Sequence, residues 1–183
     1  ASCGMFDLTA QFAEEFISED ETYKIIRDSR GVVAQHHKKE SGHTPHWLER
    51  PVKTPSEWWD YKDRLVFNDQ RIDQSCLDKA KVLRDKNRFV CLFNADPYEQ
   101  AWPVFGQEQI FMAMLENPDI VKDALDTWAD LTVECLDHYT RSGLDYDGYF
   151  MYGDMGYRNG TLFGPDVYRT LLMPAHKKIV NFL

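Results

Sequence analysis

The sequence lacks the features that would place the chain in a membrane or on nucleic acid. No apolar run approaches the roughly 18 residues of a membrane-spanning helix, and the first residues lack the basic-then-apolar order of a signal peptide. Lysine and arginine number 21 against 30 acidic residues, for a formal charge of −9. This charge opposes a broad attraction to nucleic acid or to an anionic membrane surface. We therefore expect no nucleic-acid partner, no membrane association and a cytoplasmic location.

Cysteine is scarce, and its four residues are widely spaced: Cys3, Cys76, Cys91 and Cys135. They form no C-x-x-C pair, so neither a disulfide framework nor a zinc knuckle is predicted. We expect buried free thiols.

Histidine gives only a weak metal motif. In His43-Thr-Pro-His46 two imidazoles lie three residues apart, but a metal site needs three or four ligands, and no fitting cysteine or acid lies nearby. His36 and His37 are neighbours on an expected strand and point to opposite faces. His138 and His176 fall within expected helices, at the surface or half-buried. The sequence therefore predicts no metal site.

The residues that are present suffice for one globular core. Of 183 residues, 43% are hydrophobic and 14% aromatic, enough for a single domain over residues 1–183. The chain begins without Met and stops inside the apolar helical pattern Ile179-Val-Asn-Phe-Leu183, which carries no stop signal. We therefore expect an incomplete portion of a longer protein, whose partner is its own remainder or further copies in a homo-oligomer.

Strands and helices alternate along the second half of the chain. A continuous apolar run over residues 88–96 predicts a strand buried on both faces, as in parallel sheets. The strongest helical periodicity covers residues 118–143. A strand over 148–152 follows, and then a helix from Pro165 that Pro174 should kink or restart. Because crossovers of this length require parallel pairing, the predicted fold class is α/β.

The first half predicts a short antiparallel hairpin and two helices. Two β-rich runs within residues 21–39 flank the turn Asp28-Ser-Arg-Gly31, and residues 40–54 predict a loop. Thr54 as N-cap and Pro55 at the first helical position begin a helix. A weaker helix is predicted over residues 70–85.

The most informative stretch runs from Asp145 to Pro165, from a buried strand through a Gly-rich loop into a helix. Asp154 stands where the strand ends. In a barrel of alternating strands and helices, the C-terminal ends of the strands and the loops after them carry the chemistry. Gly156 and Gly160 allow tight turns and a close approach of a ligand to the main chain. Asp154 is therefore a candidate site group, with a solvated loop acid as the alternative.

Several stretches together resemble the uroporphyrinogen decarboxylase superfamily. Its members include the porphyrin-pathway decarboxylase and zinc-dependent methyltransferases that act on corrinoid or thiol carriers. The stretches are Ile26-Arg-Asp-Ser-Arg-Gly-Val-Val33, Pro51-Val-Lys-Thr-Pro-Ser-Glu-Trp58, Asp96-Pro-Tyr-Glu-Gln-Ala-Trp102 and Gly153-Asp-Met-Gly-Tyr-Arg-Asn-Gly-Thr-Leu-Phe-Gly-Pro165 with Met173-Pro-Ala-His-Lys-Lys178. They cover nearly all of the chain and match the middle part of such a protein. The resemblance implies part of a TIM (β/α)8 barrel with parallel strands, plus the antiparallel hairpin near the N-terminus.

The resemblance implies an enzyme, a carboxy-lyase that decarboxylates a tetrapyrrole or related carboxylated substrate without a cofactor. Asp154 and Tyr98 are the implied catalytic groups. Asp154 would accept N–H bonds or act as general base, and Tyr98, on the loop after the first strand, would donate to a substrate carboxylate or simply pack. The implied substrate-binding residues are Asn94, Asp96, Tyr152, Arg158 and Asn159, of which Arg158 suits bidentate binding of a carboxylate. Glu99 is either an active-site acid or an ordinary loop acid, and the loop acid is the favoured interpretation.

Two alternatives stay open. The methyltransferase branch binds zinc through a His-x-Cys pair and a later Cys, on strands that would follow Leu183, so its ligands would lie outside this chain. The decarboxylase branch uses an N-terminal Arg-rich segment and an early-strand Asp, which this sequence also lacks. A non-catalytic barrel that binds a tetrapyrrole or corrinoid-like molecule is the other alternative.

Overall fold

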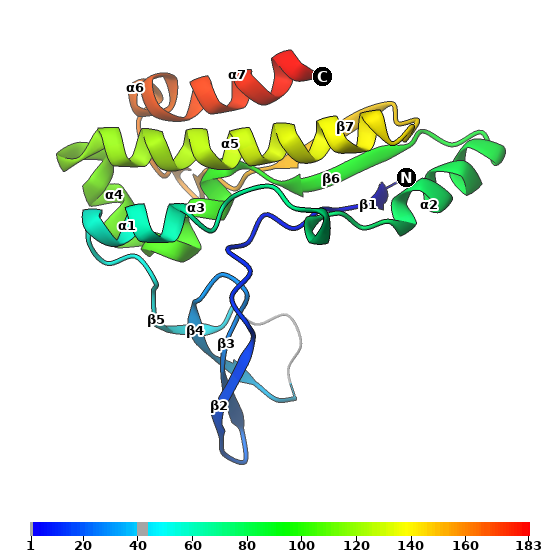
Figure 1. Ribbon diagram of the computed structural model, residues 1–183. Coiled ribbons are helices and arrows are strands. Elements are labelled where there is room, and N and C mark those ends of the chain that lie inside the picture. Colours follow the sequence, from blue (N-terminus) through cyan, green and yellow to red (C-terminus); the bar gives the residue numbers. More distant parts are fainter. Residues whose placement is uncertain (1, 40–43) are drawn as a thin grey trace.

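The chain folds into a parallel sheet covered by helices and a separate antiparallel sheet, as the computed structural model shows for residues 2–39 and 44–183 (Figure 1). The parallel sheet contains β1 (Ser2–Gly4), β6 (Cys91–Ala95) and β7 (Gly148–Tyr152), in the order β1-β6-β7. The predicted α/β class is therefore confirmed. Strands β6 and β7 pair in register up to Ala95 and Tyr152, so both end at one edge of the sheet, here called the C-terminal edge.

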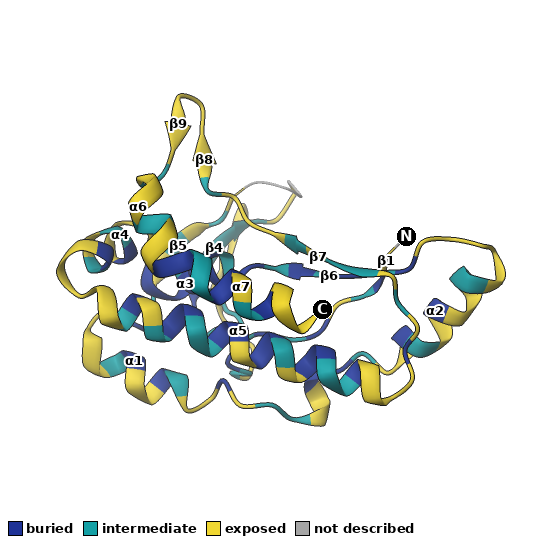
Figure 2. Ribbon diagram, turned by 90° about the horizontal axis from the view of Figure 1, so that it is seen from above, coloured by how far each residue is buried: buried dark blue, intermediate teal, exposed yellow. Residues whose placement is uncertain are grey.

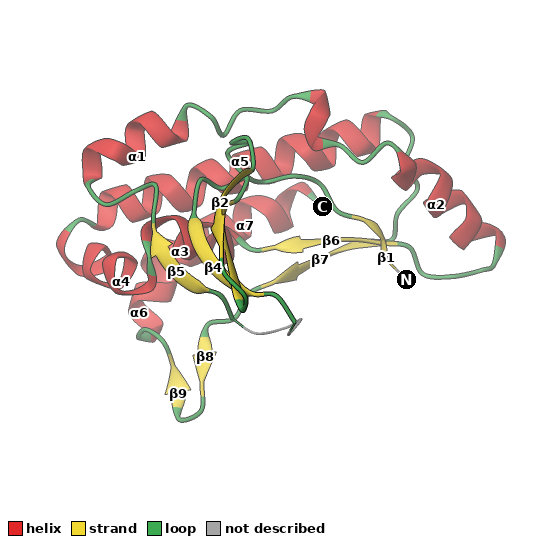
Figure 3. Cartoon of the chain, turned by 90° about the horizontal axis from the view of Figure 1, so that it is seen from below, coloured by secondary structure: helices red, strands yellow, loops and turns green. Residues whose placement is uncertain are grey.

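One face of the parallel sheet is covered and the other is open among the described residues. Leu92 and Asn94 of β6 are buried, while Phe93 between them is only half-buried. On the open face Phe93 stacks on Phe150 of β7 with ring centroids 5.5 Å apart. Figure 3 shows β6 and β7 from this side. The prediction that the first of these strands is buried on both faces is wrong, because the described helices pack on one face alone.

Seven α-helices are present in the described part of the chain. They are α1 (Pro55–Lys62), α2 (Ser75–Asp85), α3 (Pro97–Phe105), α4 (Gln107–Glu116), α5 (Pro118–Arg141), α6 (Pro165–Val167) and α7 (Met173–Phe182), with a 3-10 turn η1 (Asp69–Arg71) and a π turn η2 (Tyr168–Leu172). The long predicted helix is confirmed as α5, whose buried face forms the centre of the core (Figure 2). There Trp128 packs against Trp58 of α1 at 5.4 Å and donates its indole N–H to the Leu8 carbonyl.

The last helix is interrupted where proline predicts it. The π turn η2 ends at Leu172, and α7 starts at Met173, directly before Pro174. Because proline has no N–H to donate to the preceding turn, a regular α-helical ladder cannot run through this point. The interruption predicted at Pro174 is confirmed.

The antiparallel sheet stands away from the helical body (Figure 1). Its strands are β2 (Glu15–Glu19), β3 (Tyr23–Arg27), β4 (Val33–His37) and β5 (His46–Glu49), paired in that order. The predicted hairpin is confirmed as β3–β4, but the prediction of a loop over residues 40–54 is wrong at β5. This edge strand is held by pairing with β4 and by Trp47, whose ring meets Trp102 of α3 at 5.9 Å.

Three further expectations have clear outcomes. Cys3, Cys76 and Cys135 are buried free thiols, as predicted, and Cys91 is a half-buried one. His43 lies outside the described residues, and so does the pair that it forms with His46. Within residues 2–39 and 44–183, no helix has the length and apolar composition that would let it cross a membrane.

Candidate functional site

A cleft lies at the C-terminal edge of the parallel sheet, where β7 and α3 meet. It measures about 330 Å³, within the range of small-molecule sites. Its lining consists of Tyr98, Glu99, Trp102, Gln107, Tyr152, Asp154, Gly156, Tyr157 and Leu162. Four of these side chains are aromatic and two are carboxyl groups, and no lysine or arginine is among the described residues that line the cleft. The cleft is therefore suited to a ring that presents N–H groups rather than to a free carboxylate.

Asp154 and Glu99 supply the two carboxyl groups of the cleft. Asp154 follows β7 and is exposed, and its backbone N–H donates to Glu99 Oε1 at 3.0 Å. The other carboxyl oxygen of Glu99, Oε2, accepts the indole N–H of Trp102 at 3.1 Å. Burial is the main cause that raises the pKa of Glu99, and the nearby Asp96 and Asp154 act in the same direction. A carboxyl group with a raised pKa inside a cleft is typical of a functional site.

Tyr98 belongs to a helix and not to a loop, which corrects the sequence prediction. The helix α3 begins at Pro97, because Asp96 caps it by accepting the backbone N–H of Glu99 at 2.7 Å. Tyr98 is 1% exposed, and its ring packs edge-on against Phe163 at 5.3 Å. Burial raises the pKa of its hydroxyl. Tyr98 therefore stays a neutral hydrogen-bond donor at the inner wall of the cleft.

Asp96 joins the start of α3 to the C-terminal helix. Its Oδ2 lies 3.0 Å from His176 Nε2, and the Nδ1 of that ring lies 3.2 Å from the Tyr168 hydroxyl. With the proton on Nε2, the imidazole donates to Asp96 and accepts from Tyr168, so all three groups are satisfied. Asp96 is 1% exposed, and it contacts the cleft only through its neighbours. The expectation that His176 lies at the surface or half-buried is wrong, because the ring is buried against Asp96.

Asn94 is committed to the backbone. Its Nδ2 donates to the Phe6 carbonyl at 2.7 Å and its Oδ1 accepts the Ala95 N–H at 2.9 Å, and the residue is 7% exposed. The structure therefore places it beneath the cleft, where it fixes the chain after β1 to β6.

Arg158 and Asn159 lie at an exposed hairpin tip. They connect β8 (Gly156–Tyr157) to β9 (Gly160–Thr161), which pair antiparallel, and this hairpin stands off the body in Figure 2. A Gly-rich loop was predicted here, and a two-residue hairpin is found. Neither residue lines the cleft. Tyr152 and Asp154, in contrast, lie on the cleft wall beside Tyr98, so the structure brings together three of the seven predicted site residues.

Gly153 permits the close packing beneath the cleft. A Cβ atom at this position would lie 2.4 Å from Asp96 Oδ2. The main chain between β7 and Asp154 therefore runs directly over the Asp96–His176 pair, and only glycine fits without displacing it. The Asp96 N–H reinforces this contact by donating to the Tyr152 carbonyl at 2.6 Å.

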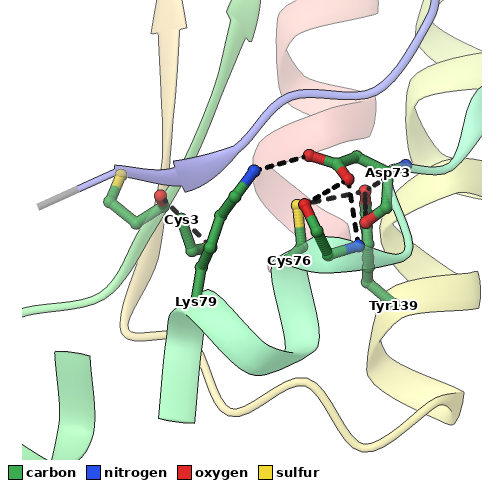
Figure 4. Close-up of polar contacts among 7 residues, drawn as sticks. Cys3, Asp73, Cys76, Lys79 and Tyr139 are labelled. Carbon is green, nitrogen blue, oxygen red and sulfur yellow. Dashed lines mark hydrogen bonds and ion pairs between the residues drawn. The ribbon is translucent and has the colours of Figure 1, made fainter. Parts of the chain in front are cut away.

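A second polar cluster, near β1, is satisfied within itself (Figure 4). Asp73 accepts hydrogen bonds from Ser75 and from Lys79 Nζ at 2.9 Å. These two contacts lower the pKa of Asp73 to about 2. Tyr139 donates to the buried Cys76 thiol at 3.4 Å. Each charge here has its partner, so the cluster is a structural joint between α2, β1 and α5.

No three side chains of the kinds that bind metals come together within the described ranges 2–39 and 44–183. The zinc that the methyltransferase branch implies therefore finds no fitting ligand set among these residues, and we derive no step that involves it.

The sequence interpretation favours a loop acid for Glu99, which lines the cleft, and it misses His176, which bonds to Asp96 beneath the cleft. A local signal for Glu99 exists, because Asp96-Pro97-x-Glu99 is a helix-start pattern. His176 has no local signal, since its partner Asp96 is 80 positions away.

Neither a protein-family model nor a curated protein sequence matches this chain. The site is therefore interpreted from its own chemistry.

Proposed function

We propose that the protein is an enzyme of the uroporphyrinogen decarboxylase superfamily, and that β1, β6 and β7 are a sector of a (β/α)8 barrel. The reaction is decarboxylation of a tetrapyrrole or related carboxylated substrate, without a cofactor. One observation carries the proposal: a cleft with two carboxyl groups and four aromatic rings opens at the edge where the parallel strands end. In barrel enzymes this edge carries the active site.

The chemistry of the cleft supports an N–H-bearing ring as its ligand. Decarboxylation of an acetate arm on a pyrrole requires protonation of the ring, loss of carbon dioxide, protonation of the methylene carbon that is left, and return of the ring proton to a base. The protein contributes placement and electrostatics. Asp154 accepts the pyrrole N–H or moves the proton, and Tyr98 donates from the inner wall. At about 330 Å³ the cleft holds one substituted ring rather than a whole tetrapyrrole.

The substrate carboxylates need binding groups outside this lining. Arg158, on the exposed tip of the β8–β9 hairpin, is the proposed group, because a guanidinium binds a carboxylate through two parallel hydrogen bonds. The remaining carboxylates would be bound by other parts of the protein.

The test is anaerobic incubation of the protein with uroporphyrinogen, followed by mass spectrometry of the products and measurement of released carbon dioxide. Stepwise loss of carboxyl groups is expected. Tight binding of the tetrapyrrole without turnover would contradict the proposal and favour a binding barrel. Zinc-dependent methyl transfer to or from a corrinoid or thiol carrier would instead favour the methyltransferase branch.

A further inference from the structure

Two helices of this chain begin with a similar pattern, yet the glutamate three residues after each cap has different hydrogen-bond partners. Thr54-Pro55-Ser56-Glu57 starts α1, and Asp96-Pro97-Tyr98-Glu99 starts α3. At α1 the pattern closes as a capping box, with Glu57 Oε2 accepting the Thr54 N–H at 2.7 Å. A glutamate at this position commonly makes that bond. The Glu99 carboxylate does not make this bond, because the Asp96 N–H donates to the Tyr152 carbonyl.

Glu99 instead joins two parts of the cleft. One oxygen accepts the Asp154 N–H, from the loop after β7, and the other accepts the Trp102 indole N–H, from α3. Both partners line the cleft, as Glu99 itself does. The distance along the chain between Glu99 and Asp154 is 55 residues, so this bond fixes one strand-end segment relative to another.

Apart from these two hydrogen bonds, the described surroundings of Glu99 offer its negative charge little compensation. Asp96 and Tyr98 belong to the start of its own helix, and Asp154 and Tyr152 face it from the side of β7. The other nearby charged groups are one step removed: Arg50 lies over the Trp102 ring at 5.9 Å, and His176 of α7 contacts Asp96. At Glu99, burial outweighs the two hydrogen bonds and the pKa is raised. At Glu57, the hydrogen bonds from the Lys53 and Thr54 backbone N–H groups outweigh burial and the pKa is lowered.

We propose that Glu99 is a positioning residue of the site: its carboxylate binds the N–H of Asp154 and the indole of Trp102, and thereby sets where the Asp154 carboxyl group stands in the cleft. This inference rests on the proposed function, in which Asp154 acts on the substrate. A misplacement of about 1 Å in such a group is enough to cost on the order of 100-fold in rate.

If Glu99 has this role, activity and stability should depend on pH in opposite directions. Activity requires the carboxylate, so it falls as the pH drops through the pKa of Glu99, which lies above the ordinary glutamate value. Stability behaves in the other direction. Because the folded-state pKa is raised, ionisation of Glu99 costs stability, and this cost grows as the pH rises through that pKa.

The experiment compares Glu99→Gln with Glu57→Gln, which removes the same charge from the same helix position at α1. In Glu99→Gln only one of the two N–H partners keeps an acceptor oxygen, so kcat should fall by about 10- to 100-fold and the acid limb of the pH–rate profile should disappear. Its Tm at neutral pH should stay unchanged or rise. Glu57→Gln should keep kcat and the acid limb but lower Tm. Wild-type kcat and an unchanged acid limb in Glu99→Gln would overturn the proposal.

Trp102→Phe supplies a second readout that a purely structural role would not move. Removing the indole N–H takes one hydrogen bond from the carboxylate, so the acid limb should shift to higher pH. An acid limb that does not move would argue against a role for Glu99.

A measurement without substrate separates this inference from the proposed function. In a ¹⁵N NMR titration of the wild-type protein, the Asp154 amide resonance should follow the ionisation of Glu99, and in Glu99→Gln that transition should vanish. If the wild-type amide shows no such transition, the positioning of Asp154 by Glu99 is refuted, whatever the turnover. If the transition is present but uroporphyrinogen is not turned over, the proposed function is wrong, and the positioning of Asp154 by Glu99 is still supported.

Discussion

The starts of α1 and α3 are chemically alike, and the chain uses them differently. Each has a capping side chain, a proline at the first helical position and a glutamate three residues after the cap. At α1 every partner of Glu57 is local, and its pKa is lowered. At α3 the cap Asp96 reaches α7 and Glu99 reaches the loop after β7, and the pKa of Glu99 is raised.

The hydrogen-bond partners distinguish a carboxylate that stabilises its own helix, Glu57, from one that we propose positions a site residue, Glu99. A carboxylate bonded to the N–H groups of its own helix start stabilises that helix and gains from its charge. Glu99 is ionised at a cost and bonds between segments that meet at the C-terminal edge. We therefore expect changes around α3 to alter function, and changes around α1 to alter stability alone.

The largest effect is expected at Asp154, the group that Glu99 holds. In the proposed enzyme, Asp154→Asn should abolish activity, a loss of about 100-fold or more, because the amide neither accepts a proton nor carries the charge. The melting temperature should stay within a few degrees, since the side chain is exposed. Asp145→Asn, before the start of β7, is the control and should keep full turnover. Unchanged turnover in Asp154→Asn would remove this residue from the site.

The two capping residues should differ in their cost to stability. Thr54→Ala removes only a cap, at about 1 kcal/mol. Asp96→Ala removes a cap and also leaves His176 buried without its carboxylate, at about 3 kcal/mol. Urea denaturation of both variants measures the difference. Equal losses in the free energy of unfolding would mean that the Asp96–His176 contact does not stabilise the fold. The two helix starts would then not differ in this respect.

The glycines of the β7 segment sharpen the same contrast. Gly153→Ala should lower the free energy of unfolding by about 2 kcal/mol and also lower turnover. The new Cβ would lie 2.4 Å from Asp96 Oδ2 and would force that oxygen to move. Gly148→Ala, at the other end of the strand, would meet its nearest atom at 3.5 Å, in the ring of Phe89. The control should therefore be close to wild type in both thermal melting and turnover. A harmless Gly153→Ala would show that the packing beneath the cleft is loose.

The smallest expected effect is an acid dependence at α1. Because the folded-state pKa of Glu57 is lowered, its contribution to stability is present above the unfolded-state pKa and is lost as the pH falls through the folded-state pKa. Glu57→Gln should therefore melt lower than wild type at neutral pH, and the gap should close on acidification. A gap that is independent of pH would contradict the role of the charge.

The parts of the fold with strong local signals could be predicted from the sequence. Thr54 and Pro55 mark the start of α1, the apolar periodicity marks α5, and an apolar run marks β7 over residues 148–152. The hairpin β3–β4 follows from its turn residues. In each case the information lies within a few residues of the element itself.

The parts that depend on distant contacts could not be predicted in this way. Strand β5 pairs with β4 and packs through Trp47 on α3, although its own residues resemble a loop. The start of α3 carries a local signal at Asp96, Pro97 and Glu99, but the sequence interpretation places Tyr98 on a loop after the strand. Glu99 could not be distinguished from Glu57 by pattern alone, because only the fold brings Asp154 to it.

The site was predicted in outline but not in composition. Asp154 and Tyr152 follow from their place at the end of a strand. Asn94, near the end of β6, and Asp96, directly after it, also lie at a strand end, yet Asn94 bonds to the Phe6 carbonyl and Asp96 to His176. Residues at a strand end divide between the cleft and the layer beneath it, and the alternation of side chains along β6 does not carry into the helix that follows.

The most direct test of the central claim is an anaerobic ¹H–¹⁵N NMR titration of the protein with uroporphyrinogen. Binding at the C-terminal edge should shift the Trp102 indole resonance and the Asp154 amide, and should leave the buried indoles of Trp58 and Trp128 in place. Shifts confined to residues at the opposite edge, such as Val90 and Asp147, or no shift at saturating ligand, would contradict the claim that the cleft between α3 and β7 is where this protein acts.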